Sequence, residues 1–196
     1  MFRWLESWLT PCPSHLRDMG YLRETLNVRA CRDQCFFAWE PHLRRTRALI
    51  LSAVAGCSAR RKAILLGAGM LHDVPVEELS ARFREVVLVD ILPTRAARRA
   101  AKRWPNVRLF PADVTGTIEA VHAAARRPGS KLPTVEPDLF FDDDEVDLVA
   151  SINLLSQLPY LPVQYLKQCG HHADEAVEAY ARGVVQAHLE YLARFA

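Results

Sequence analysis

Two short motifs near the middle of the chain contain the residue types that bind nucleosides. An apolar run, residues 63–66, is followed by Gly67-Ala68-Gly69, and a second run, residues 86–89, ends on Asp90. Continuous apolar runs are typical of strands that are buried on both faces of a sheet. Glycines let the backbone approach a ligand closely, and a carboxylate at the next strand end accepts hydrogen bonds from ribose hydroxyls. We therefore expect a nucleoside-binding βαβ unit here.

Two further expected strands also end on polar residues. Residues 107–110 and 147–152 are short apolar segments, and a polar turn follows the second of them. The polar side chains after these strands are Asp113, Asn153, Ser156 and Gln157. Because parallel strands end at one edge of a sheet, we expect them to converge with Asp90 in a single cleft. Asp90 and Asp113 have an alternative role, since each could instead cap the helix that follows it.

The segments that position these residues alternate between helix and strand. Before the first strand, helical spacing predicts short helices over residues 2–9 and 14–27 and a longer one from Phe36 to about Gly56. Afterwards the order is β-α-β-α-β-α-β-α, with a long loop over residues 126–145 and a last helix that starts at Asp174. This order predicts an α/β fold with a Rossmann-like, mostly parallel sheet and helices on both faces.

The expected domain organisation has two parts that pack as one unit. Residues 1–58 form an N-terminal helical layer, and residues 59–196 form the Rossmann-like domain. The last strands of such a sheet are expected to be absent, because the chain ends within or just after the helix that follows the fourth strand.

The four strand ends, taken in order, resemble those of the class I methyltransferases that use S-adenosylmethionine. Gly67-Ala68-Gly69 matches the family's GxG loop, Asp90 its ribose-binding acid, and Asp113 its adenine-binding acid. Asp147-Leu148-Val149 and the turn after it match the fourth strand, near the transferred methyl group. The cofactor-binding residues that the resemblance implies are Gly67, Ala68, Gly69, Asp73, Asp90, Ile91, Asp113, Val114 and Asn153.

The catalytic candidates are Asn153, near the sulfonium or the acceptor, and His72, as a general base. Asp73 has two interpretations: a cap for the helix that Pro75 begins, or a partner for the amino group of the methionine moiety. The sequence differs from the family pattern at Leu65, where an acid is usual, and at Leu71, where a third glycine is frequent.

Two other functions therefore stay open beside the methyltransferase. A nicotinamide-dependent oxidoreductase would also use Asp90 for ribose, although the chain lacks its third glycine and its Tyr-x-x-x-Lys motif. An inactive methyltransferase fold that only binds a ligand or partner would explain Leu65 and Leu71. For the enzyme, we expect S-adenosylmethionine as cofactor and a small-molecule acceptor.

Composition narrows the class of protein. The chain has 196 residues and a formal net charge of +2, which does not favour nucleic acid as a partner. No apolar run is long enough to span a membrane, and five cysteines without framework spacing suggest reduced thiols in the cytoplasm. Arginine and alanine outnumber lysine, as in GC-rich bacterial genomes.

We assign no metal, because neither Cys31 and Cys35 nor Cys169 with its two neighbouring histidines forms a complete ligand set. A homo-oligomer is possible, because an incomplete sheet leaves an unpaired edge.

Overall fold

The computed structural model describes residues 12–195, so the helix expected over residues 2–9 lies outside the described part. Within that part the chain forms two compact units. Unit 1 consists of the residues up to Ala30, Thr115–Pro137 and Leu155–Ala193. Unit 2 consists of Cys31–Val114, Asp138–Leu154 and the residues from Arg194. The helix α3 (Tyr21–Gln34) carries the chain from the first unit into the second.

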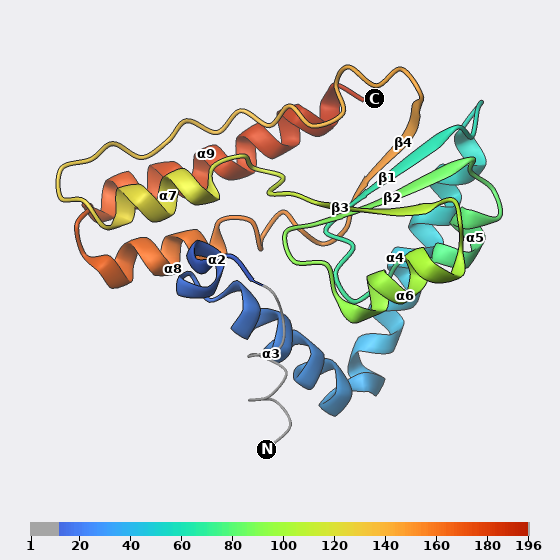
Figure 1. Ribbon diagram of the computed structural model, residues 1–196, viewed down its shortest axis with the longest axis horizontal. Helices are drawn as coiled ribbons and strands as arrows, with labels where there is room; N and C mark the ends of the chain where they lie inside the picture. The colour runs from blue at the N-terminus through green and yellow to red at the C-terminus, as the bar shows by residue number, and fades with distance from the viewer. Residues whose placement is uncertain (1–11, 196) are drawn as a thin grey trace. The chain divides into compact units, whose positions relative to one another are not determined.

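Unit 2 contains a four-stranded parallel sheet in the order β3-β2-β1-β4 (Figure 1). Its strands are β1 (Lys62–Leu66), β2 (Glu85–Asp90), β3 (Val107–Pro111) and β4 (Val146–Ser151). The predicted α/β fold is confirmed: the sheet is all-parallel, flanked by helices and Rossmann-like. The inner strands β1 and β2 are buried almost throughout, which explains their unbroken apolar sequences.

Three helices of unit 2 pack on one face of this sheet. They are α4 (Phe36–Gly56), α5 (Val76–Ser80) and α6 (Arg95–Arg103). Ile50 and Val54 of α4 join the hydrophobic core together with Leu79 of α5 and two alanines of α6. The long helix expected from Phe36 to about Gly56 is confirmed, and it includes Pro41 in its interior.

At the edge of the sheet where the strands begin, β4 contains an extra residue. Lys62 pairs with Val146 and Ala63 with Leu148, so Asp147 has no partner on β1 and forms a β-bulge. Its carboxylate accepts from the backbone N–H of Arg61 at 2.6 Å and from the Arg61 guanidinium at 2.5 Å. These contacts hold the pKa of Asp147 at about 2.

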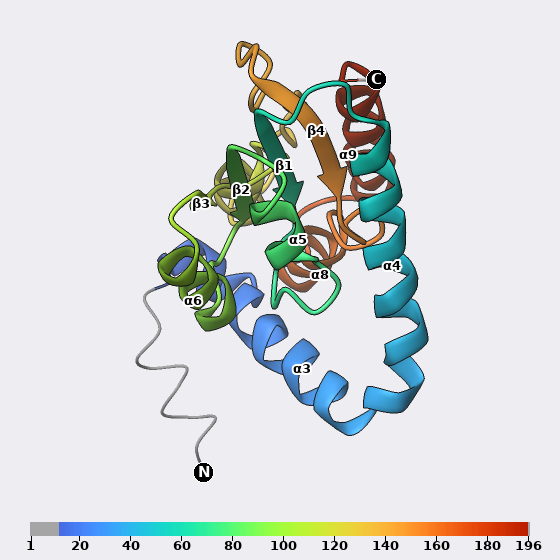
Figure 2. The same cartoon turned by 90° about the vertical axis from the view of Figure 1, so that its right-hand side faces the viewer.

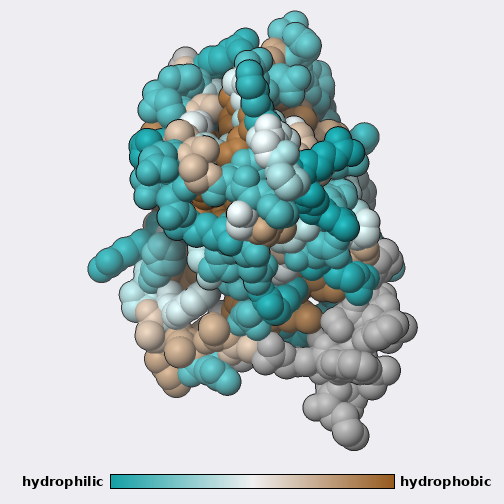
Figure 3. Space-filling model, turned by 90° about the vertical axis from the view of Figure 1, so that its left-hand side faces the viewer, coloured by the Kyte–Doolittle hydropathy of each residue, from teal (hydrophilic) through white to brown (hydrophobic). Residues whose placement is uncertain are grey.

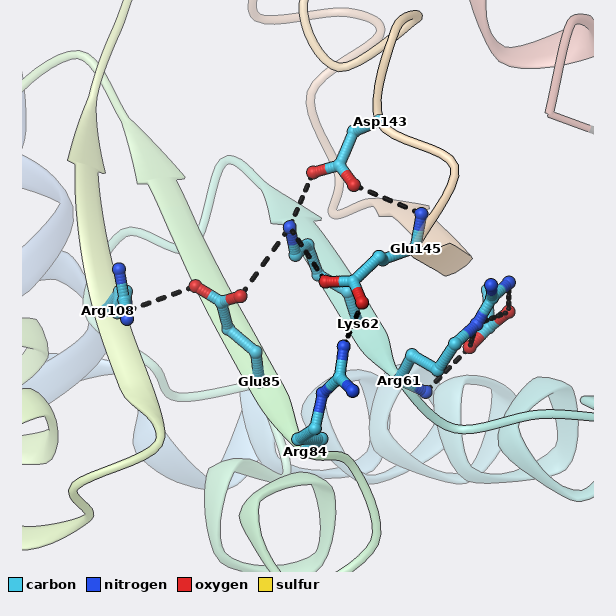
Figure 4. Close-up of polar contacts among 8 residues, drawn as sticks. Arg61, Lys62, Arg84, Glu85, Arg108, Asp143 and Glu145 are labelled. Atoms are coloured by element: carbon cyan, nitrogen blue, oxygen red, sulfur yellow. Dashed lines mark hydrogen bonds and ion pairs between the residues drawn. The ribbon is translucent and has the colours of Figure 1, made fainter.

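Charged side chains surround Lys62 at this edge (Figure 4). Its ammonium lies 2.5 Å from an oxygen of Asp143 and 3.5 Å from one of Glu85, and the side chain is only 14% exposed. Glu85 also pairs with Arg108, and Glu145 pairs with Arg84. The network joins the starts of the strands, far from the edge where the polar turns lie.

Unit 1 is helical. It contains α2 (Ser14–Asp18), α7 (Ile118–Ala125), α8 (Tyr160–Cys169) and α9 (Asp174–Ala193), and α8 packs against both α7 and α9 (Figure 1). The expected single helix over residues 14–27 is wrong, because Gly20 adopts a φ of 88° and separates α2 from α3. The long loop between Ala125 and Val146 is confirmed.

The surface drawn in Figure 3 is hydrophilic over most of its area, with apolar side chains showing in small patches. Among residues 12–195, no helix has both the length and the apolar character needed to cross a bilayer.

Candidate functional site

The strand order defines the place where a ligand would bind. From β1 the chain continues to β2 and β3 on one side of the sheet, and β4 lies on the other side. In such sheets the loops diverge at the carboxyl ends of the two neighbouring strands between which the strand order reverses, here β1 and β4, and ligands bind at this topological switch point. The loops that follow β1 and β4 are the glycine loop at Gly67 and the turn at Asn153, both in unit 2.

The glycine loop is tied to the end of the neighbouring strand. The backbone N–H groups of Gly67 and Ala68 both donate to the Val89 carbonyl, at 2.9 and 3.1 Å. Gly67 and Gly69 have φ values of 75° and 49°, in the left-handed region that favours glycine. Leu71, where the family pattern often has a third glycine, also has a positive φ of 61°. The loop thus keeps a glycine-type backbone at Leu71 at the cost of strain.

Asp90 holds this loop through its side chain. One carboxylate oxygen accepts from the backbone N–H of Gly69 at 2.8 Å, and the other accepts from Leu92 at 3.0 Å. Burial raises the pKa of Asp90, and the backbone donors at Leu92 and Gly69 oppose that rise. The structure therefore brings together the two motifs that the sequence singled out, with the carboxylate directly against the glycine loop.

The carboxylate retains hydrogen-bonding capacity in this position. Two carboxylate oxygens offer about four acceptor sites. The bonds from Gly69 and Leu92 use one on each oxygen, and the Ile91 backbone N–H is a third donor to this carboxylate. Asp90 is half-buried. The remaining acceptor capacity matches a ribose hydroxyl, so the residue fits the nucleoside part of a cofactor.

Thr94 is a site-supporting residue that sequence reasoning missed. Its hydroxyl donates to the Gly69 carbonyl at 2.7 Å and accepts from the Ala97 N–H at 3.3 Å, which caps α6. The alternative role of Asp90 as the cap of this helix is therefore wrong. A threonine immediately before the helix was the available signal.

Ile91, Asp113 and Val114 lie close to Asp90 along the same edge. Asp90 pairs with Pro111 across β2 and β3, so Asp113 follows two residues beyond that pair. Asp113 and Ile91 are half-buried, and Val114 is buried. The cap residue of α7 is Thr117, so the alternative role of Asp113 as a helix cap is wrong.

Asp73 and Asn153 meet across the switch point. The Asn153 amide donates to the Asp73 carboxylate at 2.7 Å, and Asn153 has a left-handed φ of 52°. The cap residue of α5 is Pro75, so the expected capping role of Asp73 is wrong. His72 is half-buried beside Asp73, and its carbonyl accepts from the Arg47 Nε–H at 3.0 Å. Ser156 and Gln157 belong to unit 1.

Leu154 covers Gly67 directly. A Cβ atom on Gly67 would lie 2.4 Å from Leu154 Cγ, a distance that real Cβ atoms essentially never show. Position 67 therefore requires glycine for two reasons: the Leu154 side chain fills the space of a Cβ atom, and the backbone has a positive φ. Sequence reasoning did not identify Leu154, because the contact depends on how two loops from different strands meet.

Within residues 12–195, no group of three or more His, Cys, Asp or Glu side chains is arranged to hold a metal ion. No protein-family model, curated protein or solved structure matches the chain. The geometry at the carboxyl edge of the sheet is thus the basis for assigning a function.

Proposed function

We propose that this chain is an S-adenosylmethionine-dependent methyltransferase that acts on a small-molecule acceptor in the cytoplasm. One observation carries the proposal: a half-buried carboxylate, Asp90, lies 2.8 Å from the Gly69 N–H, beside the switch point of a parallel sheet. This arrangement suits an adenosine whose ribose donates to the carboxylate. Asp113, at the next strand end, would accept from the adenine amino group.

The residues of this edge have separate roles in the proposed reaction. S-adenosylmethionine supplies an activated methyl group on a good leaving group, so the protein needs chiefly to bind and orient the reactants. Gly67, Ala68 and Gly69 would bring the backbone close to the cofactor. Asp73 and Asn153, which share a hydrogen bond, would contact the methionine end, and His72 would take a proton from a hydroxyl or amine acceptor.

A second candidate is a binding module without turnover, and one observation favours it. Leu154 covers Gly67, where the family pattern has the methionine end of the cofactor. A ligand that occupies the nucleoside part alone would leave this contact intact. A nicotinamide-dependent oxidoreductase has no specific observation in its favour, because Asp90 would hold a ribose equally well in both enzymes.

Calorimetric titration separates these functions. We expect S-adenosylhomocysteine to bind at micromolar concentration, and Asp90→Ala to weaken it about 10- to 100-fold, since each lost bond to a charged acceptor costs about 1.5–3 kcal/mol. NADH is the parallel ligand. The matched control is Glu77→Gln, which changes an exposed acidic residue in the first turn of α5.

The outcomes are distinct. Binding of the thioether that is lost only in Asp90→Ala supports the cofactor site. Equal affinity of the Asp90→Ala and Glu77→Gln variants would contradict it. Binding of adenosine alone, with no effect of the methionine end, would favour the binding module, and preferential binding of NADH would favour the oxidoreductase.

A further inference from the structure

The first half of α4 extends beyond the carboxyl edge of the sheet. The helix has 21 residues, or about 31 Å, whereas β1 has five residues, or about 17 Å. Its last turns run antiparallel to β1, because the chain leaves α4 at Gly56 and enters the strand at Lys62. The first turns therefore continue past the ends of the strands, on the side of the candidate site (Figure 2).

One face of α4 carries apolar residues on both sides of Arg47. Trp39, Leu43, Ile50 and Val54 follow one another at intervals of four, seven and four residues, which places them on one side of a helix. Ile50 and Val54 are buried against the sheet, at 5% and 0% exposure. Leu43 and Trp39 continue the same face beyond the sheet, where they are half-buried.

Phe36 begins this face, seven residues before Leu43, and is 39% exposed. We refer to Phe36, Trp39 and Leu43 as the overhang stripe. Its surface is large, aromatic and only partly covered by the protein. It lies above the loops of the carboxyl edge, because Arg47, one turn further along α4, donates from Nε to the carbonyl of His72 at 3.0 Å.

A positively charged residue, Arg47, follows the overhang stripe one helical turn after Leu43. Besides Arg47, α4 carries Arg44 and Arg45, and its only acidic residue is Glu40, which lies 3.9 Å from Arg44. A guanidinium has five N–H donors, and the bond from Nε to His72 uses one of them. The remaining fork is suited to bind a carboxylate or a similar anion.

We propose that the overhang stripe and Arg47 bind the methyl acceptor, and that this acceptor is a small organic anion with a flat apolar body. The apolar body lies against Trp39 and Leu43, and the anionic group pairs with Arg47. This inference rests on the proposed methyltransferase function. A second copy of the chain fits the stripe less well, because it would bring a second Arg47 to this face and no acidic residue of α4 other than Glu40, which lies next to Arg44.

Two matched probes test the inference: 2-naphthoate, and its neutral analogue 2-naphthamide. We expect naphthoate to bind several-fold more tightly, because only the anion pairs with Arg47. Trp39→Ala and Leu43→Ala should each weaken naphthoate about fivefold or more, since each removes apolar contact area. Arg47→Gln should abolish the preference for the anion.

Control variants come from the same helix. Leu49→Ala and Arg45→Gln change an exposed apolar residue and an exposed arginine that do not lie on the stripe, and both should bind naphthoate like the wild type. Thermal unfolding identifies any variant that fails to fold. If either Trp39→Ala or Leu43→Ala is unfolded, the other still tests the stripe. Titration of S-adenosylhomocysteine into each variant reports the cofactor site separately.

The inference is overturned if naphthoate does not bind, or if the stripe variants bind it as well as the controls do. A wild-type dimer that Trp39→Ala converts to a monomer in sedimentation would also overturn it, because the stripe would then be an interface between copies. If S-adenosylhomocysteine fails to bind while the naphthoate results hold, the methyltransferase proposal fails and the anion site stands. The reverse pattern rejects the anion site alone.

Discussion

The side chain of Leu154 occupies the space next to the Cα atom of Gly67, where a Cβ atom would lie only 2.4 Å from Leu154 Cγ. This contact joins the loop after β1 to the turn after β4, the two segments that meet at the switch point. It makes the glycine loop part of the hydrophobic packing of the protein. Substitution at Gly67 should therefore affect stability before any ligand is considered.

We expect Gly67→Ala to destabilise the protein by about 2–5 kcal/mol, from overpacking of about 1–3 and a left-handed φ that costs about 1–2. In the double variant with Leu154→Ala the overpacking disappears, so the two effects should not add. Urea unfolding of the four proteins in this cycle measures the coupling. Simple additivity would show that Leu154 is not the residue that restricts position 67.

Binding of S-adenosylhomocysteine should depend on the protonation of Asp90. Burial raises the pKa of this carboxyl, so a proton binds it more readily in the folded than in the unfolded protein. Acidification therefore does not destabilise the fold through Asp90, but it removes an acceptor from the ribose site. As the pH is lowered, we expect the affinity for S-adenosylhomocysteine to start falling before the pH reaches the ordinary Asp pKa of about 3.9.

Calorimetry between about pH 4 and 8 measures this effect, because this range extends upwards from the ordinary carboxyl pKa, in the direction in which the pKa of Asp90 is raised. Asp90→Asn is the control, since its amide does not titrate and its remaining pH dependence belongs to the ligand and to other groups. Parallel profiles for the two proteins would show that Asp90 does not contact the ligand.

Asn153 combines a left-handed backbone with a side-chain hydrogen bond, and two substitutions separate these roles. Asn153→Gly keeps the positive φ without strain but removes the amide that donates to Asp73, whereas Asn153→Ala removes the amide and adds strain. We expect alanine to be less stable than glycine by about 1 kcal/mol in thermal or urea unfolding.

These two variants differ in their expected stability, but their effects on ligand binding should be alike. If the amide contacts the methionine end of the cofactor, both variants lose affinity for S-adenosylhomocysteine to a similar extent. Wild-type affinity in Asn153→Gly would assign the residue to the shape of the turn alone.

The bond between Asp147 and Arg61 should make stability depend on pH. The pKa of Asp147 lies at about 2 in the folded protein, below the value of an unfolded chain. Its stabilising contribution is therefore complete above the unfolded pKa and is lost as the pH falls from about 5 towards 2. We expect Asp147→Asn to lower the urea midpoint at neutral pH, and this difference should shrink as the pH falls towards 2 and vanish below it.

The matched control is Asp142→Asn, which changes an exposed carboxylate of the preceding loop. Its urea midpoint should follow that of the wild type across the pH range. An equal fall in both variants would assign the effect to net charge and not to the pair with Arg61.

The sheet could be predicted from the sequence because its signals are local. Four apolar runs correspond to β1–β4 within one or two residues, and their polar ends do lie along one edge. The contact between Asp90 and the glycine loop agrees with the spacing that suggested a βαβ unit. These features depend on residues that are near in sequence or that parallel pairing brings together automatically.

Other features depend on packing or were hidden by ambiguous residues. Helix α8 was not predicted, since Pro159 and Pro162 resemble helix breakers, although here they occupy the cap and the first turn. In α9 the apolar spacing of the sequence predicts a buried stripe that includes Val177, Tyr180, Val184 and Leu189. The first three are buried, but Leu189 is 46% exposed, because His188 and Tyr191 continue the buried spacing in its place. Apolar character alone favoured the leucine.

The β-bulge at Asp147 has a consequence for how the chain tolerates changes in length. Removing one residue from a strand normally turns every following side chain to the opposite face of the sheet. Deletion of Asp147 would instead leave Val146 opposite Lys62 and Leu148 opposite Ala63, as they already are. Among the residues of β4, Asp147 is therefore the position at which the strand can lose a residue while Leu148 keeps its place in the core.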